Sequence, residues 1–192
     1  MATGKMSGMT IQDPDRPSIL FSENVRVPFW VIGILGLVLG VTAGAMTGVA
    51  VRNLVGDDPI IAGSDATLFY VCFALAVLLD IFLLFNFTNL AITVNDRGLE
   101  FRYGMFGKFF AWDTMSNAKS NEYRWITYGG WGIRFSTQGR RAWSQLSVKE
   151  GVVVDVTEGG KKRHYFISTR RPEELESVLL SKIAVEDTEP PA

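Results

Sequence analysis

Two long apolar stretches dominate the first half of the chain. Residues 28–50 contain no charged side chain and only Thr42 and Thr47 as polar ones, and residues 67–88 contain a single charge, Asp80. Each stretch exceeds the ~20 residues that a helix needs to cross a hydrocarbon core of ~30 Å. The pattern therefore predicts a transmembrane two-helix hairpin over residues 27–89, with spans at about 28–50 and 67–88.

From residue 90 onwards the pattern changes to short alternating runs. The series AITV, NDRG, LEFRY predicts a β-hairpin, and the turn YGMFGK leads into a further strand, FFAW. A weaker strand is expected over Met115–Glu122, and WGIRFS, GVVVDV and HYFIS complete a series of about seven strands. The side chains expected to face inward are Leu99, Phe101, Tyr103, Trp131, Ile133, Phe135, Val152, Val154 and Val156.

The last periodic segment, PEELESVLLSKIA, predicts a helix. Proline stands at its first turn with two glutamates beside it, where they complement the helix dipole. Leu175, Val178, Leu179 and Ile183 form one apolar stripe. A helix that follows about seven strands is expected to cap a small barrel or sandwich over residues 90–184.

The distribution of charge and the composition predict the location and the order of the two ends of the chain. Arg16 and Arg26 precede the first span, and Arg97 and Arg102 follow the second, whereas the connecting loop is mainly acidic. The positive-inside rule therefore predicts a cell-membrane protein with both termini in the cytoplasm. Residues 1–26 and the acidic tail 185–192 are expected to be disordered. The single cysteine, Cys72, excludes a disulfide within the chain.

Several segments resemble a known group of proteins. YGGWGIRFS, GVVVDV and FISTRRPEEL, together with NVRVPFW before the first span, are similar to two-span membrane proteins of actinobacterial type. Those proteins carry a bacterial pleckstrin-homology-like (PH-like) domain after a helical hairpin. The resemblance implies a membrane-anchored α+β protein whose cytoplasmic domain is a PH-like seven-strand barrel or sandwich with a C-terminal helix. It implies no reaction.

The first span carries glycines at strict four-residue intervals: Gly36, Gly40, Gly44 and Gly48. Small residues allow membrane helices to approach closely. The second span has its own row at this spacing, Cys72, Ala76 and Asp80. We expect the two rows to pack against each other within the hairpin, with self-association through the glycines as the alternative.

Asp80 is costly inside a span and should face protein or water. One interpretation is a proton-linked or partner-binding group. The other, which we favour, is a hydrogen bond between helices to Thr42, Thr47 or the backbone. With no second ionisable group in either span, a transport pathway is not favoured.

Basic side chains are in excess over acidic ones in residues 91–182. A possible lipid-headgroup set consists of Arg140, Arg141, Lys161, Lys162, Arg163, Arg170 and Arg171. Such residues are attracted to anionic headgroups. Ordinary solvated turns are the simpler explanation, and binding of nucleic acid is not expected for a modest surplus on a tethered chain.

The segment YRWITYGGW is rich in aromatic side chains. Trp125, Tyr128 and Trp131 form a possible partner surface, because aromatic residues are enriched at the centres of interfaces. We expect most of these rings, with that of Tyr123, to belong to the core instead.

Residues for catalysis are scarce. His164 is the only histidine, and no metal-ligand cluster, nucleophile motif or phosphate loop is present, so no catalytic residue, metal or cofactor is predicted. The sequence favours a non-enzymatic membrane protein that contacts lipids and docks a protein partner, or serves as an accessory subunit. An anionic-lipid sensor is the alternative, and a membrane enzyme or transporter component that uses Asp80 is a distant third.

Overall fold

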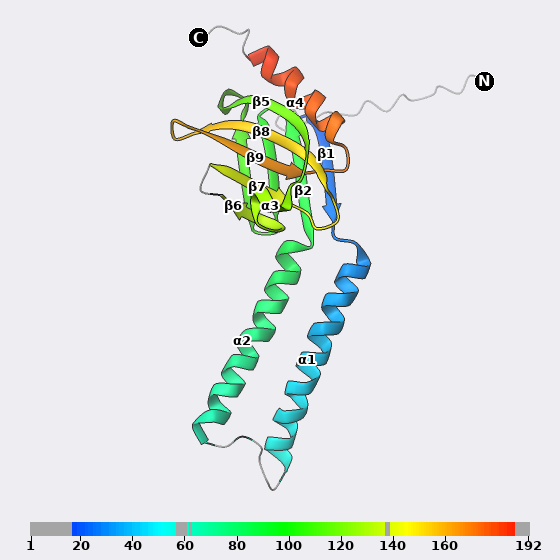
Figure 1. Cartoon of the computed structure of the whole chain (residues 1–192), viewed down its shortest axis with the longest axis vertical. Helices are drawn as coiled ribbons and strands as arrows, with labels where there is room; N and C mark the ends of the chain where they lie inside the picture. Colours follow the sequence, from blue (N-terminus) through cyan, green and yellow to red (C-terminus); the bar gives the residue numbers. More distant parts are fainter. Residues whose placement is uncertain (1–16, 57–60, 62, 137–138, 187–192) are drawn as a thin grey trace, which may run out of the picture.

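Two long helices lie side by side below a β domain in the computed structural model, which describes residues 17–56, 61, 63–136 and 139–186 (Figure 1). Helix α1 (Phe29–Val55) and helix α2 (Gly63–Phe87) are both long and apolar enough to cross a membrane. Helix α1 extends past the predicted end at residue 50, and α2 begins before the predicted start at residue 67. At the far end, the Asn53 amide donates a hydrogen bond to the carbonyl oxygen of Ile61 at 2.9 Å.

The hairpin is inserted into the β domain. Strand β1 (Ile19–Arg26) precedes α1 and pairs antiparallel with β2 (Asn89–Asn95), which follows α2. The prediction of a disordered segment through residue 26 is therefore wrong over β1, because the Phe21 and Val25 side chains are buried in the core. Residues 1–16 of that predicted segment lie outside the described residues.

Nine strands among the described residues form two open sheets. The first sheet has the order β1-β2-β3-β4, with β3 at Gly98–Tyr103 and β4 at Phe106–Ala111. The second has the order β5-β8-β9-β7-β6 and is antiparallel except for the parallel pair β7 and β9. Its strands are β5 (Met115–Glu122), β6 (Gly132–Phe135), β7 (Arg140–Ser144), β8 (Glu150–Glu158) and β9 (Lys161–Ser168). The expected number of about seven was too low because β1 and β7 were missed, and the barrel alternative is wrong because the sheets do not close.

Aromatic side chains join the two sheets. The Phe101 ring of β3 meets Trp143 of β7 at 5.1 Å between centroids, and Phe110 of β4 meets Tyr165 of β9 at 4.6 Å. The predicted inward faces of β3 and β8 are confirmed, since their side chains are buried. The prediction for WGIRFS is confirmed only for Ile133, which packs against the core. Phe135 and Trp131 are 67% and 44% exposed, because β6 is a short edge strand.

Helix α4 (Pro172–Glu186) closes the end of the β domain that lies opposite the hairpin (Figure 1). Leu175, Leu179 and Ile183 are buried, which confirms the apolar stripe. The helix packs mainly against β5. It includes residues 185 and 186 of the predicted disordered tail, and residues 187–192 lie outside the described part.

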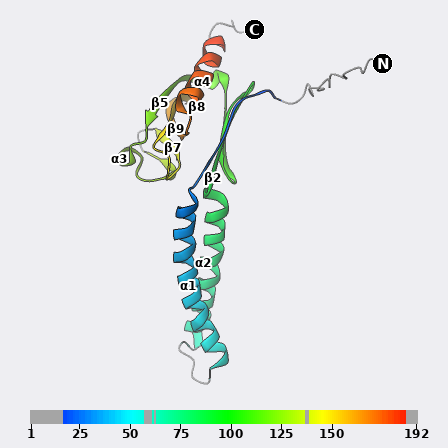
Figure 2. The ribbon, with the colours of Figure 1, turned by 90° about the vertical axis from the view of Figure 1, so that its right-hand side faces the viewer.

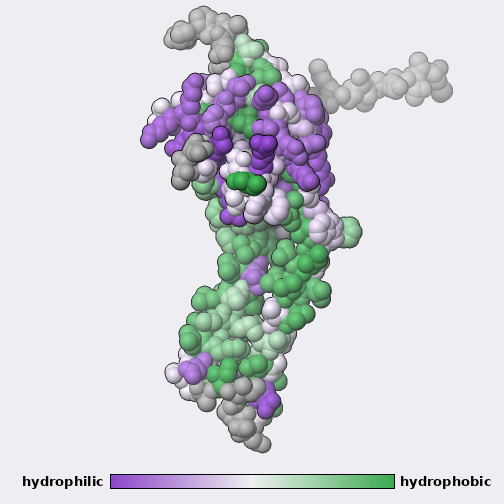
Figure 3. Space-filling model, viewed as in Figure 1, coloured by the Kyte–Doolittle hydropathy of each residue, from purple (hydrophilic) through white to green (hydrophobic). Residues whose placement is uncertain are grey.

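The two sheets occupy different positions relative to the helices. In Figure 2 the strand β2 continues upwards from α2, while β7, β9 and the short helix α3 (Trp125–Tyr128) lie to one side of the hairpin. Hydrophilic residues gather on the upper part of the β domain in Figure 3, and the hairpin is almost entirely apolar. The lower edge of the second sheet therefore overhangs the space beside the hairpin.

Candidate functional site

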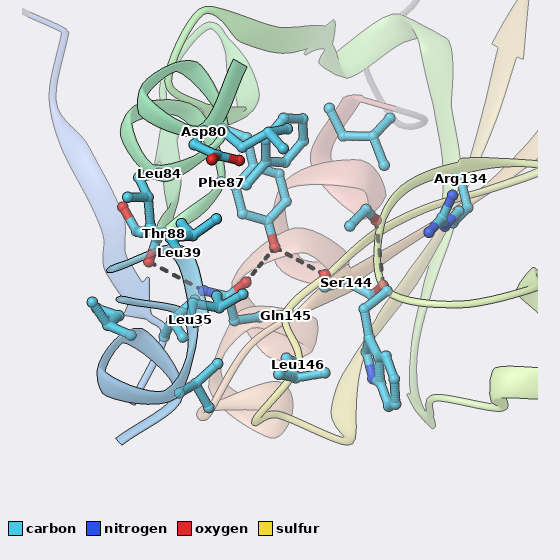
Figure 4. A pocket seen from close by; sticks show the side chains of 18 residues that line it. Leu35, Leu39, Asp80, Leu84, Phe87, Thr88, Arg134, Ser144, Gln145 and Leu146 are labelled. Atoms are coloured by element: carbon cyan, nitrogen blue, oxygen red, sulfur yellow. Dashed lines mark hydrogen bonds between the residues drawn. The ribbon is translucent and has the colours of Figure 1, made fainter. Parts of the chain in front are cut away.

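A cavity of about 560 Å³ lies where the hairpin meets the β domain (Figure 4). Its walls come from both helices and from the segment around β6 and β7. The helical wall includes Val31, Leu35, Leu39, Asp80, Leu84 and Phe87. The opposite wall includes Tyr103, Trp131, Arg134, Ser144 and Gln145. The cavity is thus apolar on the helical side, except at Asp80, and mixed on the side of the β domain.

Gln145 holds the two ends of the hairpin to the β domain. Its amide nitrogen donates hydrogen bonds to the carbonyl oxygens of Val25 and Thr88, both at 3.3 Å. The Tyr103 hydroxyl lies 2.8 Å from the Gln145 side-chain oxygen, and burial raises the pKa of Tyr103, so this hydroxyl stays protonated. The backbone N–H of Val27 also donates to Thr88 at 2.9 Å. These bonds fix the rim of the cavity.

A second contact fixes the end of α2. The Asn86 side chain is buried, and its oxygen accepts a hydrogen bond from the N–H of Met105 at 3.0 Å. Gly104 turns the chain here with φ +47°, and an added Cβ would lie 2.5 Å from that oxygen. Only glycine fits this turn without strain. The β3–β4 turn is thereby held against the last turn of α2.

Asp80 lies on the helical wall, one of the few half-buried residues of α2. The predicted hydrogen bond from Thr42 is absent, because the Thr42 hydroxyl donates to Val38 and Leu39 of its own helix, at 2.9 and 3.0 Å. Thr47 is exposed. Within the part of the chain that the structure describes, the Asp80 carboxylate has no hydrogen-bond or ion-pair partner. Asp80 is thus an acidic residue in the otherwise apolar helical wall of the cavity.

The glycine row does not face α2. A Cβ added at Gly36, Gly40, Gly44 or Gly48 would meet nothing within 4 Å, and Cys72 and Ala76 of α2 are exposed. The predicted packing of the two rows is therefore wrong, and of its residues only Asp80 turns inward. The half-buried positions of α1 are Leu39, Ala43, Met46, Val49, Ala50 and Asn53. Because successive helix positions are rotated by about 100°, a row one place away points elsewhere.

The basic residues do not gather at the edge of the β domain beside the hairpin. Arg141 and Arg163 both reach Glu158, at 3.2 and 3.3 Å, and Lys108 of β4 joins them at 2.7 Å. We call Glu158 and these three cations the Glu158 cluster. Arg140, Lys161 and Lys162 are exposed nearby on β7 and β9. The β8–β9 turn projects from the side of the domain, above the level of α3 (Figure 1).

Arg170 and Arg171 lie elsewhere and hold β1. Arg171 donates to the carbonyl oxygen of Ser22 at 2.6 Å and covers the Phe21 ring at 4.4 Å. Arg170 donates to the carbonyl oxygen of Arg26 at 3.3 Å. The predicted headgroup set thus divides into two separate groups. Arg141, Arg163, Arg170 and Arg171 contact other parts of the fold, and Arg140, Lys161 and Lys162 are exposed. The basic residue that lines the cavity is instead Arg134.

The aromatic segment also divides. Tyr128 is half-buried and stacks on Tyr123 at 5.2 Å, and both rings contact Phe166. For Tyr123 and Tyr128 the expected core role is therefore confirmed. Trp125 is 54% exposed and contacts Trp131, whose ring also lines the cavity. The exposed part of the predicted partner surface is thus Trp125 and Trp131.

Groups for metal chemistry are not assembled. In residues 17–56, 61, 63–136 and 139–186, no three His, Cys, Asp or Glu side chains lie together as metal ligands would. His164 is exposed, and its Nδ1 lies 2.6 Å from the Asp155 carboxylate. Sequence reasoning missed Gln145, Asn86 and Arg134. No local pattern marks them, because their roles depend on contacts with distant segments.

Comparisons with protein-family models, with curated proteins and with solved structures found no match for this chain.

Proposed function

We propose that this protein is a non-enzymatic membrane module that binds an amphipathic lipid in the cavity between its hairpin and its β domain. The observation that carries the proposal is the cavity itself. Its volume of about 560 Å³ is typical of small-molecule sites, which are mostly apolar with a few convergent polar groups. Apolar helix side chains on one wall and polar side chains on the other match a molecule with a chain and a head.

In this proposal α1 and α2 cross the cell membrane and both termini are cytoplasmic. Large apolar side chains on the outer surfaces of the helices support this placement, for example Leu37 and Leu78, which are 67% and 62% exposed. Such a surface is unfavourable in water and favourable in lipid. Arg26 and Arg134 beside the β domain, against the acidic loop at the far end, support the orientation.

The β domain is proposed to be PH-like. Support comes from the arrangement of two packed sheets followed by a helix that covers one end of the core. The parallel pair β7 and β9 and the strand that precedes the hairpin are departures from the expected seven-strand plan. The lipid-binding proposal does not depend on this assignment, since it rests on the cavity.

The position of the cavity along α2 and the charged residues that line it support a lipid as the ligand. Asp80 lies seven positions before the end of α2, which is about 10 Å along the helix. A lipid of the inner leaflet therefore reaches the cavity with its chain beside Leu35, Leu39 and Leu84. An anionic head would lie towards Arg134, and a hydroxyl or amine near Asp80 would satisfy the carboxylate.

The test is to identify lipids that remain bound to the purified full-length protein, by native mass spectrometry after mild detergent extraction. Leu35→Trp fills the cavity, and Leu37→Trp is its matched control because Leu37 faces away from it. We expect a lipid adduct on the original chain and on Leu37→Trp, and its loss from Leu35→Trp. Equal adducts on all three chains, or none on the original, would contradict the proposal.

Protein docking is a second candidate, favoured by the open glycine row. Because the row meets nothing within 4 Å among the described residues, it leaves a face of small residues on α1 against which a helix of a partner, or of a second copy, would pack. This is the accessory-subunit hypothesis in a specific form.

A further inference from the structure

The connection between β5 and β6 presents three large apolar side chains to solvent. Trp125 is 54% exposed, Ile126 92% and Trp131 44%. They lie on the short helix α3 and directly after it. We call Trp125, Ile126 and Trp131 the apolar tip.

Packed aromatic rings and a hydrogen-bonded turn lie directly below the apolar tip. Below it, Tyr123 and Tyr128 are stacked on each other and on Phe166, and the Tyr123 hydroxyl donates a hydrogen bond to the carbonyl oxygen of Gly130. The chain reverses direction through Gly129 and Gly130, at φ +75° and +119°. Local packing and turn geometry therefore hold the three side chains outward.

The position of the tip indicates what it touches. Trp131 lines the same cavity as Leu35 and Leu39 of α1, so the tip lies beside the first turns of the hairpin. Figures 1 and 2 both show α3 at the edge of the β domain that meets the helices, and Figure 2 shows it displaced to one side of them. The surface below the tip is then the lipid next to the hairpin.

We propose that the apolar tip inserts into the inner leaflet and forms a third membrane contact of this protein, besides its two spans. The inference rests on the membrane placement proposed above, but not on the lipid in the cavity. Tryptophan is favoured at the membrane–water boundary, and isoleucine is favoured just below it. Arg124 and Arg134 flank the tip in sequence and are exposed, which places cations at the level of the headgroups.

A lipid surface explains the tip better than a protein does. The tip offers side chains with no acceptor and only the indole N–H groups as donors, whereas protein interfaces combine an apolar centre with a polar rim that forms hydrogen bonds. Continuity with the cavity also matters, because the same Trp131 ring would close the cavity on the lipid side. The tip then limits the tilt of the β domain over the membrane.

The test measures depth with a spin label in the full-length protein, reconstituted in vesicles of neutral and anionic phospholipid. Cys72 is first replaced by alanine, and single cysteines are introduced by Ile126→Cys, Leu37→Cys and Thr157→Cys. The label at residue 37 is the reference for a lipid-exposed position in the first span. The label at residue 157, on an exposed position of β8, is the reference for a water-exposed position. The readout is the collision rate with oxygen, which enters lipid, against that with a water-soluble nickel chelate.

We expect the label at residue 126 to resemble that at residue 37, with high access to oxygen and low access to nickel. A label at residue 126 that behaves like the one at residue 157 overturns the inference and leaves the tip to a protein partner. If residue 37 is also accessible to nickel, the membrane placement itself fails. The two failures are therefore distinguishable. Ile126 is almost fully exposed, so its replacement leaves the core intact.

Discussion

At the scale of single residues, the Glu158 cluster shows how charge joins the two sheets. Lys108 belongs to β4 of the first sheet, while Arg141, Glu158 and Arg163 belong to the second. The hydrogen bond from Lys108, followed by that from the Tyr165 hydroxyl, lowers the pKa of Glu158 below its ordinary value. Burial raises the pKa of Tyr165, so it remains a donor. One carboxylate thus compensates three cations at an open edge.

This arrangement predicts a pH dependence of stability. A carboxylate whose pKa is lowered on folding contributes its full stability above the unfolded pKa of about 4.5, and the contribution is lost as the pH falls through the lowered value. Glu158→Gln should therefore reduce the free energy of unfolding by about 1 kcal/mol at neutral pH, and by less in acid. Thermal unfolding in detergent between pH 3 and 7 measures this difference, with Glu122→Gln, an exposed residue, as the control. A deficit that does not change with pH would contradict the role given to the ionised carboxylate.

At the scale of elements, the composition of α1 and α2 does not reveal which of their faces pack against each other. Side chains are apolar around almost the whole circumference of α1, so no periodicity indicates which row meets α2. The sequence therefore predicted both spans but placed the glycine row on the wrong side. By contrast, the polar neighbours of Leu175, Leu179 and Ile183 mark the buried face of α4, and that prediction was correct.

The open glycine row predicts a particular result for Gly40→Leu combined with Gly44→Leu. Because a Cβ added at these positions meets nothing within 4 Å among the described residues, the unfolding temperature of the monomer should not fall. If a partner helix packs on the row, the same change should abolish the complex recovered by affinity purification in mild detergent. Leu37→Ala together with Val41→Ala, also on exposed positions, serves as the control. A clear loss of monomer stability would restore the packing between the rows that the sequence predicted.

Strands were predicted where a buried face alternates without interruption. Leu99, Phe101 and Tyr103 mark β3, and Val152, Val154 and Val156 mark β8. Strand β1 was missed because only Phe21 and Val25 are fully buried, at a spacing of four, and the segment stands before the first span. The cavity was not predictable, since Gln145 and Arg134 meet the helices only when segments far apart in sequence are folded together.

At the scale of the molecule, the β domain is discontinuous. Its first strand comes before the hairpin and the others come after it. Residues 90–192 alone therefore lack a strand that pairs along the full length of β2 and contributes Phe21 and Val25 to the core. Arg170 and Arg171 also lose partners, because the Arg170 N–H donates to the Glu23 carboxylate at 3.1 Å and the Arg171 side chain donates to the carbonyl oxygen of Ser22 at 2.6 Å.

This topology predicts which shortened chains fold. Residues 90–192 should be insoluble or unfolded, whereas residues 17–26 joined through a short glycine-containing turn to residues 89–186 should form a stable soluble domain. The turn is feasible because Arg26 and Asn89 are paired neighbours of an antiparallel ladder. Dispersion of amide signals in NMR spectra and cooperative thermal unfolding measure the outcome. Equal folding of both chains would show that β1 is dispensable.

The insertion of the hairpin between β1 and β2 also sets an order of events during synthesis. When β1 leaves the ribosome, its partner strand has not yet been made, because both helices are synthesised before β2. We proposed above that these two helices cross the membrane. Strands β1 and β2 pair from Arg26 and Asn89 onwards, so this ladder forms only if both strands lie on the same side of the membrane. With this proposed placement, completion of the β domain acts as a check on membrane topology: when one helix is left uninserted, β1 and β2 lie on opposite sides of the membrane and the core does not assemble.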